Sequence, residues 1–254
     1  MKQLQGQVAL ITGAAGGFGR ALTRLLLREG CALILADRRS EQLRDAAAAA
    51  ASSASAAPGR LLGFVAADLS APAGAAALHR AAVGISPRVD ILVNNAGLGI
   101  YGRIDQIPAE RWEAVMQVNL LAPMRLTALF LPQMLARGSG HIVNICSAAS
   151  LVGARGLSVY GASKFGLRGF TEALAQDVRR HGVDVTGIYP FFARTPILKS
   201  EQFGGEPPAG VPDRLIGDPE RIMAALVRGI KGRQLHIYPD PIARLIDLLR
   251  RVGG

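Results

Sequence analysis

Tyr160 and Lys164 stand four residues apart, with only a glycine, an alanine and a serine between them. Side chains at this spacing share one face of a helix, so a phenol would lie beside an ammonium group. A free tyrosine has a pKa of about 10, which is too high for a base at neutral pH, but a nearby positive charge lowers that pKa. The pair could therefore move a proton, although the same spacing also occurs in ordinary packed helices whose lysine is solvated.

A glycine-rich turn stands near the other end of the chain. Gly13, Gly16 and Gly19 follow an apolar run and open a helical pattern. Glycines so placed permit a tight bend, let the backbone approach a pyrophosphate and let the helix pack on its strand, while the positive helix end favours an anion. Glycine-rich turns are common, but this position after the first predicted strand favours a bound dinucleotide.

Asp37 ends the second predicted strand, 18 residues after Gly19. A carboxylate there can accept the hydroxyls of an adenosine ribose and repel a 2′-phosphate, although it could also be a helix N-terminal charge. Arg38 and Arg39 follow at once, and a guanidinium could either neutralise Asp37 or hold a phosphate. No lysine or arginine comes just before Gly16, where a second phosphate contact would help. We therefore favour NAD over NADP.

The elements that must position these residues are visible as an alternating pattern. Continuous apolar runs predict strands that are covered on both faces, at 8–12, 32–37, 62–66, 89–94, 141–146, 183–189 and 235–238. Helical patterns alternate with them at about 17–29, 41–51, 72–82, 109–136, 157–180 and 218–230. This order predicts an α/β fold with a doubly wound parallel sheet of about seven strands and helices on both faces.

Composition and charge argue against several classes of protein. The net charge is +10, but the arginines are scattered and no basic stripe with interleaved aromatics appears, so we expect no nucleic-acid partner. Cys31 and Cys146 lie in apolar runs, which predicts buried thiols, no disulfide framework, no metal site and a cytoplasmic location. No stretch reaches 18 uninterrupted apolar residues, so we expect a soluble protein.

Taken in order, the motifs resemble the short-chain dehydrogenase/reductase family. Thr-Gly-x-x-x-Gly-x-Gly begins at residue 12, Asn-Asn-Ala-Gly occupies 94–97, and Asn119, Ser147 and Tyr160-x-x-x-Lys164 follow, so the resemblance covers about 6–196. It implies a single-domain Rossmann fold over 1–254 that binds NAD or NADP. It also implies that Tyr160 is the general acid/base, that Ser147 hydrogen-bonds the substrate oxygen, and that Lys164 holds the nicotinamide ribose. By the same resemblance, Asn119 supports a water that links Lys164 to solvent.

The resemblance further implies a set of cofactor contacts at the glycine turn and after later strands. Asp68 would meet the adenine amino group, with helix capping as the alternative. Beside Tyr160 and Lys164, the expected cofactor-binding residues are Gly13, Ala15, Gly16, Phe18, Gly19, Asp37, Arg38, Asp68, Leu69, Asn95, Ala96, Gly97, Pro190 and Thr195.

Two regions depart from the family's usual pattern. After the sixth strand the family usually has Pro-Gly-x-Val-x-Thr, whereas this chain has Phe191 for the glycine and Ala193 for the valine. Phe191 and Phe192 could wall an apolar pocket. The proline- and glycine-rich segment 196–217 predicts a substrate lid. The segment 240–254 predicts an amphipathic basic helix, for which packing on its own subunit or a partner is favoured over membrane contact.

These expectations combine into one hypothesis. The chain is expected to transfer a hydride between NAD(P) and an alcohol or ketone, one of lipophilic character, and to form a homo-oligomer. A cofactor-sensing or binding protein without turnover is the alternative on the same fold. A methyltransferase with a related glycine turn explains neither Ser147 nor the pair of Tyr160 and Lys164.

Overall fold

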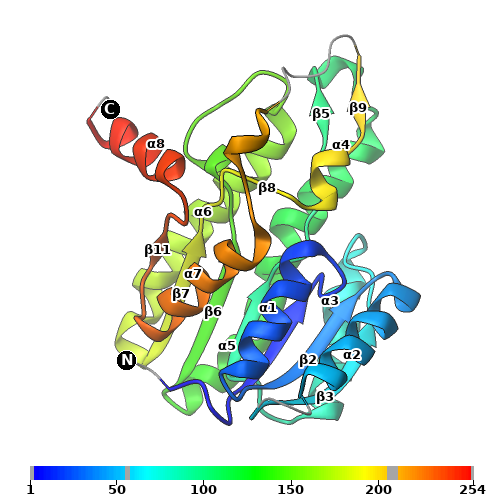
Figure 1. Ribbon diagram of the computed structural model, residues 1–254, viewed down its shortest axis with the longest axis vertical. Coiled ribbons are helices and arrows are strands. Elements are labelled where there is room, and N and C mark those ends of the chain that lie inside the picture. Colours follow the sequence, from blue (N-terminus) through cyan, green and yellow to red (C-terminus); the bar gives the residue numbers. More distant parts are fainter. Residues whose placement is uncertain (1–2, 55–57, 205–210, 253–254) are drawn as a thin grey trace.

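The computed structural model describes residues 3–54, 58–204 and 211–252. A seven-stranded sheet forms its centre, and all neighbouring strands are parallel, in the order β11-β7-β6-β4-β1-β2-β3 (Figure 1). The strands are β1 (Val8–Thr12), β2 (Ala32–Asp37), β3 (Arg60–Ala66), β4 (Ile91–Asn94), β6 (Gly140–Ile145), β7 (Val183–Ile188) and β11 (His236–Ile237). The predicted parallel sheet is confirmed.

Helices cover both faces of this sheet, as the sequence pattern predicts. They are α1 (Gly17–Arg28), α2 (Ser40–Ala54), α3 (Pro72–Ile85), α5 (Ala122–Ala136), α6 (Ser158–Val178) and α7 (Pro219–Lys231). Buried side chains of α1, α2 and α7 share one core layer, and those of α3, α5 and α6 share the other. In β1, Ile11 enters the first layer and Leu10 the second, and neither is exposed. Both faces are apolar, which explains the continuous rather than alternating strand sequences.

The long helical pattern at 109–136 is not one regular helix. It consists of α4 (Ala109–Met116), a π-helical turn η2 (Gln117–Leu121) and α5. By length and composition this run could cross a membrane, but Leu126, Phe130 and Met134 are buried in the core layer of α3, α5 and α6. We therefore interpret it as a core helix. π-Helical turns often occur at functional sites, and this one contains Asn119.

Short elements lie beyond the carboxyl edge of the sheet, and the sequence pattern does not predict them. β5 (Tyr101–Gly102) pairs with β9 (Gln202–Phe203), and β8 (Phe192–Ala193) pairs with β10 (Ile216–Gly217). The predicted lid at 196–217 contains β9, β10 and the 3₁₀ turn Pro196–Lys199, while 205–210 lie outside the described residues. Helix α8 (Pro241–Val252) forms where an amphipathic helix is predicted, and it projects from the body (Figure 1).

The fold positions the candidate site through the direction of its strands. Because the strands are parallel, their carboxyl ends meet at one edge. Gly13, Asp37 and Asn95 lie at the ends of β1, β2 and β4, and Ser147 and Pro190 lie two residues beyond β6 and β7. Residues far apart in the sequence are therefore brought together at this edge.

The contact between the glycine turn and α1 can be tested through Gly19. A Cβ atom at this position would lie 2.3 Å from the carbonyl oxygen of Gly13 and 2.6 Å from Cα of Ala14. Because these are backbone atoms, we expect Gly19→Ala to lower the free energy of unfolding by about 1–3 kcal/mol, and the melting temperature by about 5 °C. Thermal unfolding measured by circular dichroism checks this.

Gly169 is the control for this prediction. It is exposed within α6, and a Cβ atom there would meet no atom within 4 Å. Gly169→Ala is expected to raise stability by up to about 1 kcal/mol, because alanine favours helix. Equal melting temperatures for the two variants would contradict the tight contact at Gly19.

Candidate active site

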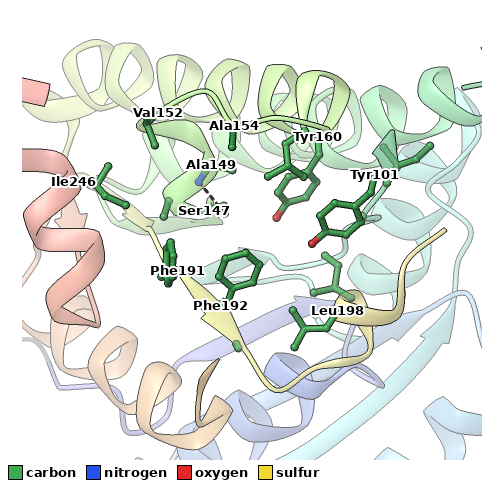
Figure 2. A pocket seen from close by; sticks show the side chains of 16 residues that line it. Tyr101, Ser147, Ala149, Val152, Ala154, Tyr160, Phe191, Phe192, Leu198 and Ile246 are labelled. Atoms are coloured by element: carbon green, nitrogen blue, oxygen red, sulfur yellow. Dashed lines mark hydrogen bonds between the residues drawn. The ribbon is translucent and has the colours of Figure 1, made fainter. Parts of the chain in front are cut away.

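A cavity of about 260 Å³ opens at the carboxyl edge of the sheet. Its walls come from 99–101, from the loop between Ser147 and the start of α6, from 191–198, and from Ile246 of α8. Figure 2 shows Phe191 and Phe192 along one side. The walls are apolar apart from a few hydroxyl groups. The two adjacent phenylalanines thus line an apolar pocket, as the sequence suggests.

The hydroxyl groups of Tyr160 and Ser147 reach this cavity together. Tyr160 is in the first turn of α6, and its oxygen points into the cavity (Figure 2). The side chain of Ser147 lies in the turn after β6, where its Oγ accepts a hydrogen bond from the N–H of Ala149 at 3.1 Å. A hydrogen bond from Ser147 also favours the ionised form of Tyr160. The two residues that are 13 apart in sequence therefore face one reacting position.

The pKa of Tyr160 differs from the sequence-based expectation. Burial raises it to about 12, and the hydrogen bond from Ser147 offsets only part of this effect. The expected lowering involves the positive ring of a bound oxidised cofactor as well as Lys164, and without that ring burial dominates the pKa of Tyr160. The physical reason is that moving a phenolate out of water raises its free energy by more than the neighbouring groups lower it. In this state Tyr160 is a neutral proton donor.

Lys164 is buried rather than solvated, with 5% of its surface exposed. Its Nζ atom donates to the carbonyl oxygen of Ile145 at 2.8 Å and lies 5.8 Å from the centre of the Tyr160 ring. Burial lowers the pKa of Lys164 to about 8. A fully buried lysine with one protein acceptor has further N–H groups to donate, which argues against a merely packed helix.

Asn119 joins three segments around this lysine. Its Nδ2 donates to the carbonyl oxygen of Leu98 at 2.9 Å and to Oγ of Ser163 at 3.0 Å, and its Oδ1 accepts from the N–H of Leu98 at 2.8 Å. A Cβ atom at Gly97 would lie 3.4 Å from Oδ1 of Asn119 and 3.8 Å from Nζ of Lys164. The predicted residues Gly97, Asn119 and Lys164 therefore converge, and Asn119 ties η2 to α6.

The turn after β1 is held by residues from the turn after β4. Nδ2 of Asn95 donates to the carbonyl oxygens of Thr12 and Gly13 at 2.8 and 3.0 Å. Oγ1 of Thr12 accepts from the N–H groups of Asn95 and Ala96, both at 3.0 Å. Gly13 adopts a positive φ of 64°, and a Cβ atom there would lie 2.8 Å from Cα of Ala96. These bonds fix the backbone of the glycine turn.

Asp37 is buried, and its carboxylate is already engaged. It accepts from the side chain of Arg39 at 3.0 and 3.2 Å, from the backbone N–H of Arg39 at 3.0 Å and from the N–H of Ala15 at 3.1 Å. Burial alone would raise the pKa of Asp37, but these bonds outweigh it and lower the pKa. Arg39 is thus the guanidinium that neutralises Asp37. A ribose hydroxyl could bind to this carboxylate only if Arg39 moved. The sequence alone left open whether an arginine would neutralise Asp37 or hold a phosphate.

Comparison with known proteins identifies the family. The model of the short chain dehydrogenases matches residues 7–203. The chain belongs to the short-chain dehydrogenase family. It is 34% identical over 209 residues to the D-beta-hydroxybutyrate dehydrogenase of Cupriavidus necator, covering 82% of this chain and 79% of that protein. Membership in this family makes the chain an oxidoreductase.

Solved structures of the family agree with the fold over its whole length. A short-chain dehydrogenase/reductase of Burkholderia phymatum, in complex with NAD, has 29% identity and a TM-score of 0.84, covering 100% of this chain and 95% of that one. A short-chain dehydrogenase of Sphingobium yanoikuyae, in complex with NADPH, has 28% identity and a TM-score of 0.81, covering 98% and 94%. Both nicotinamide dinucleotides therefore occur among the relatives.

The residues at the N-terminus of α1 fit the phosphates of such a dinucleotide. Gly16 precedes the helix, no side chain caps it and the first turn contains no acidic residue, so its N–H groups favour an anion. A Cβ atom at Gly17 would lie 2.7 Å from Cγ2 of Thr195, which places Thr195 against the turn. Phe18 is partly buried and packs on the core. Side chains larger than that of glycine at these positions would occupy the space at the N-terminus of α1 where the phosphates would bind.

Other predicted cofactor residues lie around the same edge. Asp68 is exposed and accepts from the N–H of Ser70 at 2.9 Å, which lowers its pKa; it does not cap α3, whose N-cap is Ala71. Leu69 is buried and Arg38 is exposed. The carbonyl oxygen of Pro190 accepts a hydrogen bond from the N–H of Ala148 at 2.8 Å.

Some residues of the site lie outside the sequence motifs. Tyr101 and Ile246 line the cavity. Ile246 comes from α8, which is tied to the site through Asp240: its carboxylate accepts from the N–H of Phe191 at 3.1 Å and from that of Ala243 at 2.8 Å. The amphipathic pattern predicts α8 but does not show that it borders the cavity.

The role of α8 in the cavity can be tested with Ile246→Ala. Removing part of this apolar wall should raise the KM for a bulky ketone by about fivefold, because losing contact equivalent to about one buried CH₂ group costs about 0.8 kcal/mol. Steady-state kinetics checks this. Leu245 is the control because it is 53% exposed on the same helix and does not line the cavity. Equal KM values for Ile246→Ala and Leu245→Ala would contradict the assignment.

Proposed function

We propose that this protein transfers a hydride between a nicotinamide dinucleotide and a lipophilic alcohol or ketone, with Tyr160 as the general acid/base. The observation that carries the proposal is the convergence of the Tyr160 and Ser147 hydroxyls on an apolar cavity, beside buried Lys164. A bound nicotinamide supplies the hydride, and the protein residues supply orientation and the proton. The apolar walls support a lipophilic substrate, since they gain free energy from its burial.

In ketone reduction, the substrate oxygen becomes more negative as the hydride is transferred. Tyr160 is neutral because of its raised pKa, so it can donate its proton to this oxygen. Ser147 donates a second hydrogen bond and stabilises the developing charge. In alcohol oxidation the same phenol must first lose its proton. A positive charge next to Tyr160 is then needed to lower its pKa from about 12.

The remaining site residues support and position this pair. Lys164 uses one N–H on Ile145 and has others to hold ribose hydroxyls, as the family resemblance implies. Asn119 commits both amide protons to the protein, and its Oδ1 keeps one lone pair, which leaves a place for the implied water. In our proposal, Asn119 mainly fixes the positions of Leu98 and Ser163 beside Lys164.

The protonation of Tyr160 gives a test by pH. Alcohol oxidation requires its ionised form, so the rate should rise by up to about tenfold per pH unit below its pKa in the cofactor complex. Ketone reduction requires the neutral form and should stay level over the same range. Tyr160→Phe should lower both rates by about 10²–10⁴-fold while it still binds the cofactor. Stopped-flow absorbance of the reduced cofactor, with fluorescence titration for binding, checks all three.

Two outcomes would count against this mechanism. Full turnover by Tyr160→Phe would exclude Tyr160 as the proton donor. A wild-type protein that binds the cofactor tightly but turns over none of a panel of alcohols and ketones would instead favour the cofactor-sensing alternative.

For the cofactor we propose NAD over NADP, on the strength of the buried carboxylate of Asp37 at the end of β2. Its negative charge disfavours a 2′-phosphate, and binding the ribose requires Arg39 to release it. Asp37→Ala should therefore lower the ratio of kcat/KM for NADH to that for NADPH by about tenfold, which corresponds to about 1.4 kcal/mol.

Asp45→Ala is the matched control for this measurement, because it removes an exposed carboxylate of α2 and changes the net charge equally. It should leave the cofactor ratio unchanged. If both variants shift the ratio by the same factor, the preference arises from net charge and not from Asp37.

A further inference from the structure

Tyr101 adds a third hydroxyl group to the cavity. Its backbone is fixed, because its N–H donates to the carbonyl oxygen of Glu201 at 3.0 Å within the pairing of β5 and β9. The next residue, Gly102, donates to the carbonyl oxygen of Gly156 at 2.9 Å, just before α6 begins. Figure 2 shows the oxygens of Tyr101 and Tyr160 pointing into the same cavity.

The hydroxyl of Tyr101 lacks a protein acceptor within the described part of the chain. Burial raises the pKa of Tyr101, so its hydroxyl stays protonated and remains a donor. A substrate that displaces water from this hydroxyl costs it a hydrogen bond, unless the substrate brings an acceptor of its own. A substrate oxygen at this position replaces the bond to water, and a purely hydrocarbon substrate does not.

The reacting oxygen is not the natural acceptor for Tyr101. A carbonyl oxygen has two lone pairs, and the hydroxyls of Ser147 and Tyr160 use both in the proposed reaction. Figure 2 shows the Tyr101 and Tyr160 oxygens pointing into the same cavity, so a substrate that places its reacting oxygen at Tyr160 would bring its second acceptor to Tyr101 from a position near the reacting carbon. Among the described residues that line the cavity none carries a cationic side chain, so this acceptor is a neutral oxygen and not a carboxylate.

We propose that Tyr101 is a specificity-determining residue that donates a hydrogen bond to a second, neutral oxygen of the substrate, next to the carbon that exchanges the hydride. The inference rests on the proposed function and narrows its substrate class. The enzyme prefers ketones with an adjacent ether or hydroxyl oxygen, and the corresponding alcohols, over plain alkyl ketones of the same size.

Two near-isosteric ketones test this proposal. 2-Methoxyacetophenone and butyrophenone differ only by an oxygen in place of a CH₂ group next to the α-carbon, and each has a single reducible carbonyl. For the full-length wild-type protein and Tyr101→Phe, we compare the ratio of kcat/KM for the methoxy ketone to that for butyrophenone. The ratio should fall by about fivefold in Tyr101→Phe, the effect of losing one neutral hydrogen bond.

Tyr238→Phe is the control, because Tyr238 packs against Tyr189 and does not line the cavity. It should keep the wild-type ratio. A similar loss with both ketones in Tyr101→Phe would overturn the proposal, because Tyr101 would then act on the reacting carbonyl or on the cavity as a whole. An unchanged ratio would overturn it as well.

A binding measurement separates this proposal from the proposed function. We measure the dissociation constants of the two ketones by calorimetry in the presence of the oxidised cofactor, which cannot reduce a ketone. The ratio of the two constants should differ about fivefold between the wild-type protein and Tyr101→Phe. If this change appears while neither ketone is reduced in the kinetic assay, the proposed function fails and the role of Tyr101 stands. If both ketones are reduced and neither ratio changes, the role of Tyr101 fails and the function stands.

Discussion

The burial of both faces of the sheet is the constraint on which the rest of the structure depends. Apolar layers cover the seven strands, and burying a polar group between them without a hydrogen bond raises the free energy of the fold. The polar groups of the site therefore lie where the strands end. Because every strand pair is parallel, these ends meet at one edge. The glycine turn, Asp37, Asn95 and Ser147 therefore lie along the same edge of the sheet. The hydrogen bonds from Asn95 to the turn after β1 then fix the edge itself.

Burial also determines the chemistry of the two central side chains. Tyr160 and Lys164 both have pKa values displaced toward their neutral forms, to about 12 and about 8. Simple attraction between a phenolate and an ammonium would displace them in the opposite directions. In the proposed mechanism the cofactor-free site holds a neutral acid, and added positive charge would be needed to make it a base, so proton transfer would be coupled to cofactor binding.

Much of this could be predicted from the sequence, because the information is local. The apolar runs and glycine spacing predicted the strands and the helices. The resemblance to the family, carried by short motifs, implied Gly97, Asn119, Ser147, Tyr160 and Lys164 as site residues. Long-range packing was not predictable in the same way. Nothing near Asp37 in the sequence shows which of two adjacent arginines will reach it, and the helical pattern at 109–136 hides the π-helical turn. The pKa of Tyr160 depends on how deeply it is buried, which no spacing reveals.

Asp240 links the C-terminal helix to one wall of the pocket. The Asp240 carboxylate accepts hydrogen bonds from the N–H of Ala243 in α8 and from the N–H of Phe191. The C-terminal helix and one aromatic wall of the pocket are therefore held by the same side chain. Ser147, Tyr160 and Lys164 lie on other elements and, within the described residues, share no hydrogen bond with that carboxylate. Substitutions on the cavity-facing side of α8 can therefore change the shape of the pocket without removing a hydrogen bond of those three residues.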